Sequence, residues 1–352
     1  MRKGKQICFI VLLAVLIVGA VIFITLWMMG ASERKHFPPK KLIIDTDSGA
    51  DDAAALILAA KCEDVELLGV TTLLGNADLE QGTKNTLMSL EMAGCDAPVF
   101  KGSDTSYSGK PISKGGVFGE DGMGDAGLIH PSGTPQEQDA VSFILDTVAA
   151  NPGDVEIIAL GPATNIAKAI QKDPETMKQV KRIWTMGTAG LGPGNASPVA
   201  EFNAYHDIEA YRVLLDAGIP VTIVGLDVCG GDAQWTSAQF DKLAKANDIG
   251  KFIADAFGKL REFYAANGSP DATNNCDTVA MMCCLDPTFT TASVQAHGSC
   301  ITQEGETYGQ VLFYQKGFTY DDVKNDFAYN VTLTTEVDRG RFFDQYYSII
   351  TS

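Results

Sequence analysis

Apolar residues follow two alternating periods along most of the chain, and each period predicts one kind of element. Short apolar runs such as 41–47 (KLIIDTD) and 65–75 (VELLGVTTLLG) are typical of buried strands. Between them, residues 51–61 (DDAAALILAAK) have helical spacing with acidic residues in the first turn. Strands that alternate with helices in this way predict an open, mostly parallel, doubly wound α/β sheet with right-handed crossovers.

The same alternation continues to the end of the chain. Further strands are predicted at 97–102, 155–160, 180–187, 219–227, 310–315 and 330–337. Helices are predicted at 79–94, 140–153, 163–171 and 207–218, through 236–268, and from about residue 341 onward. Residues 102–135 are rich in Gly, Ser, Asp and Pro and are predicted to be a loop. The strands and helices form one predicted domain, residues 41–352, with two C-terminal strands and a closing helix.

The first 40 residues follow a different pattern. No charged residue occurs in 6–32, whose interior reads ICFIVLLAVLIVGAVIFITLWMMG. A membrane-spanning helix needs roughly 20 apolar residues, whereas the core of a signal peptide has about 7–15. Residues 1–40 therefore predict a cytoplasmic stub, a membrane-spanning helix and a short linker. A signal peptide cleaved near residues 30–32 is the alternative.

These alternatives give two predictions for location. With the N-terminus inside, the usual outcome for an N-terminal anchor followed by a large domain, the chain is a single-pass membrane protein. Its domain then lies outside the cytoplasm. Basic residues flank the apolar run on both sides, so they do not fix this orientation. If the run is cleaved, the domain is secreted.

Composition excludes one class of partner. The chain has 352 residues, of which 45% are hydrophobic, and its formal net charge is −17. The length allows a sizeable core. The acidic balance, without a basic stretch, argues against nucleic acid as a partner. The cysteines outside the apolar run form no CxxC pair and are typical of buried small apolar residues.

Acidic side chains gather where the first strand ends. Asp45 and Asp47 close that strand, and Asp51 and Asp52 open the following helix. Ligands of open parallel sheets bind at the carboxyl ends of the strands. Other polar residues also follow predicted strands or precede helices: Asn76, Asn195, Glu201, Asn203 and Asp277. Ca²⁺ takes about 6–8 oxygen ligands, so this group predicts a calcium site whose ion offsets the repulsion among the aspartates.

Two other interpretations fit parts of the same stretch. Acidic residues in the first turn of a helix are common, so Asp51 and Asp52 alone could serve only the helix terminus. A phosphatase of the haloacid-dehalogenase type also carries DxD after an apolar strand. In that class a Thr or Val usually stands two residues after the second aspartate, whereas Gly49 stands there in this chain.

The stretch DTDSGADDAAAL (45–56) resembles the DTDxGxDDxxA signature of the nucleoside hydrolases, which cleave the N-glycosidic bond of ribonucleosides. Four later stretches resemble that family's blocks in the right order: TTLLGN (71–76), ALGPATNIA (159–167), GNASPVAEFN (194–203) and NCDTVA (275–280). The resemblance covers roughly residues 41–290.

The resemblance implies a role for each matching residue. Asp47 matches the metal-bound aspartate that activates water. The implied calcium ligands are Asp47, Asp52, the backbone carbonyl of Leu160, and Asp277. The implied ribose-binding residues are Asp51, Asn76, Asn195, Glu201 and Asn203. Asp45 matches an aspartate that lies just behind the site and orients it. The implied reaction is calcium-dependent hydrolysis of ribonucleosides to ribose and base with inversion at C1′, by a homo-oligomer, a dimer or a tetramer.

The chain departs from the best-known members at the leaving-group side. Cys276 stands where those members have histidine, which marks a subgroup, and Phe118 stands where some have another histidine. Cys276 is therefore a candidate catalytic residue, although a thiol is a poor acid for a purine leaving group. His206 is near a site block but could simply pack there; Phe118 and Trp235 could stack on the base or belong to the core. The missing histidines leave an alternative function, a membrane-tethered protein that binds or senses nucleosides with little turnover.

Overall fold

The computed structural model describes residues 37–112, 114, 116–315 and 328–352. The predicted membrane-spanning run, 6–32, lies outside the described residues. Within the described ranges, no helix is long and apolar enough to cross a bilayer. Residues Pro39–Ser352 form one compact unit.

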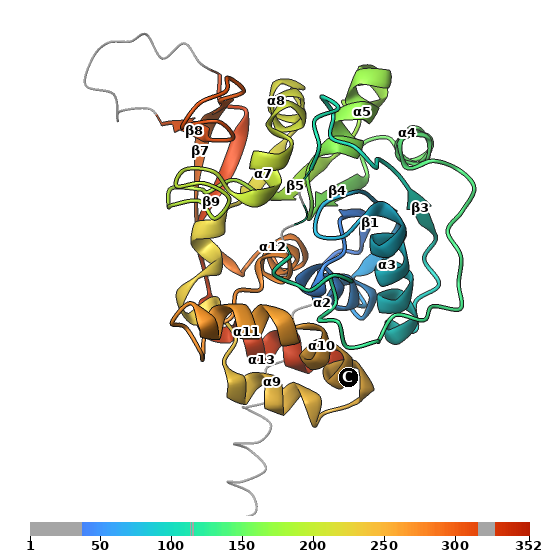
Figure 1. Cartoon of the computed structure of the whole chain (residues 1–352). Coiled ribbons are helices and arrows are strands. Elements are labelled where there is room, and N and C mark those ends of the chain that lie inside the picture. Colours follow the sequence, from blue (N-terminus) through green and yellow to red (C-terminus); the bar gives the residue numbers. More distant parts are fainter. Residues whose placement is uncertain (1–36, 113, 115, 316–327) are drawn as a thin grey trace, which may run out of the picture. The chain divides into compact units, whose positions relative to one another are not determined.

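A nine-stranded sheet forms the centre of this unit (Figure 1). In spatial order its strands are β3 (Val99–Lys101), β2 (Val65–Thr72), β1 (Lys40–Thr46), β4 (Val155–Ala159), β5 (Arg182–Met186), β6 (Val221–Val224), β9 (Val331–Val337), β7 (Thr290–Cys300) and β8 (Val311–Tyr314). The pairs from β3 through β9 are parallel; β7 pairs antiparallel with β9 and β8 antiparallel with β7. The predicted mostly parallel α/β sheet is thus confirmed.

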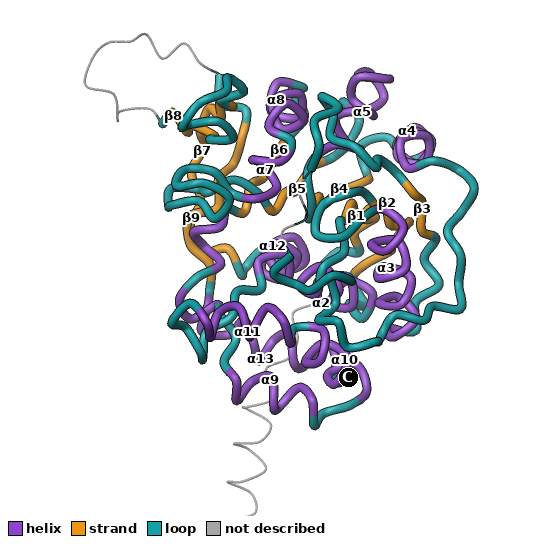
Figure 2. Tube along the Cα trace, in the orientation of Figure 1, coloured by secondary structure: helices purple, strands orange, loops and turns teal. Residues whose placement is uncertain are grey.

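Helices cover both faces of the sheet (Figures 1 and 2). On one side, a single hydrophobic core contains residues of α2 (Ala50–Ala60), α3 (Leu79–Ala93), α9 (Ser237–Ala244), α10 (Asp248–Ala256), α11 (Gly258–Ala266), α12 (Cys276–Leu285) and α13 (Arg339–Ile350). Of these helices, α2, α3 and α12 contact the strands directly. On the other side, a second core contains residues of α4 (Ala140–Ala150), α5 (Thr164–Lys172), α6 (Pro174–Met177), α7 (Phe202–His206) and α8 (Ile208–Asp216). Alternate residues of β1 enter the two cores, Ile44 on the first face and Ile43 on the second.

Several element boundaries differ from those predicted. The stretch 236–268 is divided into α9, α10 and α11, and the closing helix begins at Arg339. β7 was not predicted as a strand. Its sequence, TTASVQAHGSC, contains few large apolar residues, and most of its side chains are partly exposed, so the hydrophobic pattern of a strand is weak.

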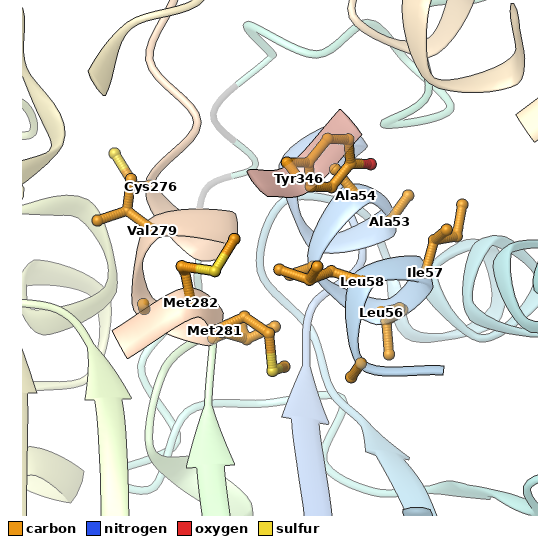
Figure 3. Packing of buried hydrophobic residues seen from close by; sticks show 14 of the residues in the cluster. Ala53, Ala54, Leu56, Ile57, Leu58, Cys276, Val279, Met281, Met282 and Tyr346 are labelled. Atoms are coloured by element: carbon orange, nitrogen blue, oxygen red, sulfur yellow. The ribbon is translucent and has the colours of Figure 1, made fainter. Parts of the chain in front are cut away.

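Two helices run through the core beside the site. All residues of α12 are buried, as are Ala50 to Ala59 of α2, and the two helices pack against each other. A helix that is apolar on every side is typical of a core position. Figure 3 shows their side chains, Ala53 and Ala54 on one helix and Met281 and Met282 on the other. Both helices carry acidic residues in their first turn, so burial of the helices also buries those carboxyl groups.

The strand order also fixes where a ligand can bind. Chain connections leave β1 towards α2 on one face and β4 towards α5 on the other. Adjacent strands whose connections diverge leave a crevice at their carboxyl ends. Asp47 follows β1 and Leu160 follows β4, so the predicted site residues lie at this crevice.

Candidate active site

The carboxyl group of Asp47 is enclosed by backbone at the end of β1. Its Oδ2 accepts a hydrogen bond of 2.7 Å from the Asn76 N–H, and its Oδ1 has no partner among the described residues. A Cβ atom on Gly75 would lie 2.0 Å from Oδ2, and one on Gly161 would lie 2.7 Å from Oδ1. Only glycine therefore fits on either side, and the two glycines fix where Asp47 can point.

This enclosure predicts a sharp difference between two glycines. If Asp47 is the water-activating aspartate that the resemblance implies, Gly75→Ala should lower kcat/KM for ribonucleoside hydrolysis at least about a hundredfold, the cost of moving a reacting group by about 1 Å. Gly82→Ala is the matched control, because its added Cβ would meet its nearest atom, the Asp47 carbonyl oxygen, at 3.4 Å. Alanine at this helical position should keep activity and slightly stabilise α3. If both variants fold and are equally active, the enclosure of Asp47 by glycine is not needed for activity.

Three further carboxyl groups lie together beside Asp47. Oxygen atoms of Asp51, Asp52 and Asp277 all lie within 4.8 Å of one another, and all three residues are buried. Burial, and then the charge of Asp52, raises the pKa of Asp51 to about 8. Burial and the neighbouring aspartates raise the pKa of Asp277 well above its usual range. In the absence of a cation, this cluster holds protons at neutral pH.

The donor set fits a hard divalent cation. It consists of oxygen atoms, and two buried ones, Asp47 Oδ1 and Asp51 Oδ1, have no hydrogen-bond partner in the described structure. Burial raises the pKa of Asp52, and burial and the neighbouring aspartates raise that of Asp277, so a cation that binds this cluster replaces protons. The first turns of α2 and α12 add favourable dipoles for the carboxylates. The residues present therefore match the oxygen ligands that Ca²⁺ takes.

The predicted calcium ligands lie near one another in the structure. Asp52 and Asp277 belong to the cluster, together with Asp51, which the sequence assigned to ribose. Asp47 lies near enough for the charges of Asp52 and Asp51 to raise its pKa. The Leu160 carbonyl accepts a 2.7 Å hydrogen bond from Asn203 Nδ2 and retains a second lone pair.

The raised pKa values predict a pH-dependent stability of the metal-free protein. In the unfolded chain an aspartate titrates near 3.9, whereas burial raises the pKa of Asp45 to about 7 and of Asp51 to about 8. Between about pH 4 and 8 the folded state thus binds more protons, and the free energy of unfolding falls as pH rises. Chelator-treated protein should melt at a lower temperature at about pH 8 than at about pH 5. Asp51→Asn should flatten this dependence, and a wild-type melting temperature that rises over this range would oppose the interpretation.

A cavity of ≈ 450 Å³ opens above these groups. The predicted polar residues that line it are Asp51, Asn76, Asn195, Glu201, Asn203 and Asp277, and Leu160 and Cys276 line it as well. Apolar and aromatic lining comes from Val117, Phe118, Leu226, Leu260, Phe263 and Tyr264. The volume suits a small ligand with one polar and one apolar part.

Glu201 is fixed at the N-terminus of α7. Its Oε1 accepts from the Asn203 N–H at 2.9 Å, and its Oε2 accepts from the N–H groups of Thr188 at 3.0 Å and Ala204 at 3.1 Å. Burial raises the pKa of Glu201 to about 7. Thr188 has φ 70° and Ser48, directly after Asp47, has φ 38°. Such left-handed conformations are costly for these residues, so strained backbone supports two carboxyl groups of the site.

Cys276 lies in the cavity wall, next to a second cysteine, Cys229. Its hydrogen bond to Cys229, then burial, raises the pKa of Cys276 well above its usual range. Cys229 in turn donates to the Gly225 carbonyl at 3.4 Å. The Cys276 thiol is therefore protonated at neutral pH.

Other candidate residues have different positions. His206 lines the cavity, with Nδ1 2.8 Å from the Phe202 carbonyl, and Phe118 lines it too. Trp235 does not: it is 1% exposed and packs among other aromatic rings, Phe240 and Tyr346 included, so of its two interpretations the core position is confirmed.

Tyr264 was missed by the sequence analysis. It lines the cavity from α11. Burial raises its pKa, so the hydroxyl stays protonated. An aromatic residue in a helical stretch carries no sequence signal that separates a cavity wall from a core.

Comparisons with known proteins agree with this geometry. The family model described as inosine-uridine preferring nucleoside hydrolase matches residues 42–344. "Probable uridine nucleosidase 1" of Oryza sativa subsp. japonica is 34% identical over 282 residues, which is 77% of this chain and 86% of that protein. "Pyrimidine-specific ribonucleoside hydrolase RihB" of Escherichia coli (strain SE11) is 33% identical over 225 residues, 64% of this chain and 70% of that protein.

Solved structures give the same result. The chain matches "Plant nucleoside hydrolase - PpNRh1 enzyme" with a TM-score of 0.83 and 30% identity, over 90% of this chain and 100% of the other. It matches "Inosine-Guanosine Nucleoside Hydrolase (IG-NH)" with a TM-score of 0.80 and 28% identity, over 89% of this chain and 98% of the other.

Proposed function

The chain belongs to the inosine-uridine preferring nucleoside hydrolase family, and on that premise we propose that it hydrolyses ribonucleosides to ribose and free base with the help of calcium. The main support for this proposal is a single cavity that is acidic and polar on one side and apolar on the other. Its carboxylate-rich floor suits a ribose that becomes positively charged, and its apolar wall suits a planar base.

Asp47 is proposed as the general base. Its Oδ1 is the carboxylate oxygen that no protein group occupies, so it can accept a proton from the attacking water. The pKa of Asp47 is raised by burial and by its acidic neighbours, which makes its carboxylate more basic than a solvent-exposed one. Attack by water on the face opposite the leaving base gives inversion at C1′.

The floor of the cavity is proposed to bind and stabilise the ribose. Cleavage of the C1′–N bond develops positive charge on the sugar, and buried carboxylates beneath it stabilise that charge. The proposed hydroxyl-binding residues are Asp51, Asn76, Asn195, Glu201 and Asn203. Asn203 uses its Nδ2 on the Leu160 carbonyl, so its Oδ1 is available to a ribose hydroxyl.

The calcium ligands are proposed to be Asp47, Asp52, Asp277 and the Leu160 carbonyl, with Asp51 within reach of the same cluster. Calcium, when bound, orders the ribose diol and lowers the pKa of water. The role of the protein is to hold these oxygens in fixed positions through α2, α12 and the turn after β1.

Free ribose is the decisive measurement for this function. The full chain, supplied with calcium, should release ribose from at least one of uridine, inosine, adenosine and nicotinamide riboside. No ribose from any of them would contradict the proposal. If calorimetry then showed tight ribonucleoside binding, the chain would instead be a nucleoside-binding protein.

We also propose an anchored location and an oligomer. The uncharged run 6–32 supports a single-pass anchor with the domain outside the cytoplasm, or secretion after cleavage. Protease protection in sealed membranes tests the orientation, because a cytoplasmic domain would resist protease added outside. Light scattering tests the proposed dimer or tetramer, and a monomer mass would contradict it.

Replacement of Cys276 by alanine should have little effect on an activated substrate. The thiol is buried and protonated, so we expect kcat for p-nitrophenyl riboside, whose leaving group needs no proton, to change less than about tenfold. Cys276→His should give at most a modest gain with inosine, because the neighbouring residues do not hold an imidazole in place. A loss beyond about a hundredfold for folded Cys276→Ala would show a catalytic role for the thiol.

A further inference from the structure

We propose that Cys229 and Cys276 form a reversible oxidation site, in which a peroxide oxidises Cys276 from the cavity and Cys229 then closes a disulfide with it. The inhibition expected from this step rests on the proposed hydrolase function. The formation of the disulfide does not.

The two thiols are far apart in the sequence and in contact in the fold. Cys276 is the first residue of α12, and Cys229 is the last residue of the 3₁₀-helix η1 (Leu226–Cys229). The Cys229 Sγ lies 4.0 Å from the Cys276 carbonyl oxygen, and each thiol affects the pKa of the other. Neither thiol belongs to a disulfide.

The two thiols differ in access. Cys276 is 8% exposed and lines the substrate cavity, whereas Cys229 is fully buried behind it. Among the cysteines that the structure describes, Cys276 is the one that lines this cavity. A small oxidant that enters the cavity therefore meets Cys276 first, and the nearest partner for the product is Cys229.

The chemistry balances with a hydroperoxide as the only co-reactant. The O–O bond of hydrogen peroxide breaks, one oxygen adds to the Cys276 sulfur as sulfenic acid, and the other leaves as water. The Cys229 sulfur then attacks the Cys276 sulfur; the S–S bond forms, the S–O bond breaks, and hydroxide leaves as water with the Cys229 proton. The pair of thiols loses two electrons, which reduce the peroxide. Because both thiols are protonated, the first step is slow compared with that of a thiolate.

A disulfide would change the candidate active site directly. A disulfide holds its two Cα atoms about 4.4–6.8 Å apart and joins the sulfur atoms by a bond of about 2.05 Å, so it would tie the end of η1 rigidly to the start of α12. Asp277 of the acidic cluster directly follows Cys276, and Leu226 of the cavity wall opens η1. We expect kcat/KM to fall at least about tenfold, as when a group that orients a metal ligand is displaced.

Peptide mass spectrometry under non-reducing conditions tests the proposal on the full chain. After hydrogen peroxide and alkylation, we expect a cross-linked peptide pair carrying Cys229 and Cys276, which appears in step with the loss of activity. Dithiothreitol should remove the cross-link and restore activity. Wild-type protein in which Cys276 stays reduced, or is oxidised without joining Cys229, would overturn the proposal.

Two cysteine variants test whether Cys229 is the partner of oxidised Cys276. Cys229→Ser should start with nearly wild-type activity but form no such cross-link, so that peroxide carries Cys276 on to sulfinic acid, which dithiothreitol does not reverse. Cys95→Ser, at a partly exposed cysteine after α3, should oxidise like wild type. If Cys229→Ser does not fold, the cross-linked peptide of the wild-type chain decides alone. If the chain releases no ribose, the cross-link still appears, so failure of the hydrolase proposal is told apart from failure of this one.

Discussion

Asp47→Asn should reduce ribonucleoside hydrolysis at least about 10²–10⁴-fold while the domain stays folded. Asparagine has nearly the same shape, so it fits between Gly75 and Gly161, and its amide oxygen can still accept from the Asn76 N–H. It cannot accept a proton from water, and it removes a negative charge from beneath the ribose. The measurement is kcat with the best substrate of the panel, at saturating calcium.

The stability of this variant separates loss of chemistry from loss of structure. Burial and the charges of Asp52 and Asp51 raise the pKa of Asp47, so the aspartate is a repulsive group in the metal-free fold. The metal-free variant should consequently melt at or above the wild-type temperature. Asp104→Asn, at an exposed position in the loop after β3, is the matched control and should keep full activity. Activity of Asp47→Asn within tenfold of wild type would refute the role of base.

The sequence located the site because its signals are local. Parallel strands end at one edge of the sheet, so acidic and amide side chains after predicted strands had to meet there. Asp47, Asn76 and Leu160 follow β1, β2 and β4, and all three lie at the crevice between β1 and β4 or beside it. The alternation of strands and helices is a local signal too, and it predicted the mostly parallel sheet. It did not predict β7, which pairs antiparallel with β9 and β8.

The arrangement inside the site could not be predicted, because it depends on contacts between distant segments. Asp51 and Asp52 are neighbours in the chain, yet Asp51 joins the cluster with Asp277 only because α2 and α12 are packed together in the core. Spacing alone cannot reveal that Cys229 touches Cys276. It also gives no sign of the left-handed backbone at Ser48 and Thr188, because the sequence there lacks the glycine that usually marks it.

β7 and Trp235 are places where the sequence pattern was weak or ambiguous. β7 is held by its pairing with β9 and β8, and such ladder hydrogen bonds form whatever the side chains are. Trp235 has the ring that a base-binding wall needs, but aromatic residues fill cores as readily as cavities. Only the tertiary structure shows that Phe263 and Tyr264 line the cavity instead.

Removal of calcium should abolish hydrolysis and lower the stability of the protein. The cluster of Asp51, Asp52 and Asp277 beside Asp47 holds protons without a cation, and a protonated Asp47 cannot act as a base. We expect chelator-treated protein to release ribose at less than about a hundredth of the wild-type rate, with recovery on addition of calcium. An ion at 100 times its Kd should add about 2.7 kcal/mol to the free energy of unfolding.

The melting temperature measures calcium binding independently of the reaction. Asp277→Asn keeps one oxygen of the side chain but removes a charge from the cluster, so the calcium-induced rise in melting temperature should shrink or disappear. Asp104→Asn should keep the full rise. Metal analysis of the purified wild-type chain completes the test, because full activity in protein shown to hold no calcium would contradict the assignment. Since the affinity depends on deprotonated carboxylates, the calcium-induced rise should also be larger at about pH 8 than at about pH 5, opposite to the trend of the metal-free protein.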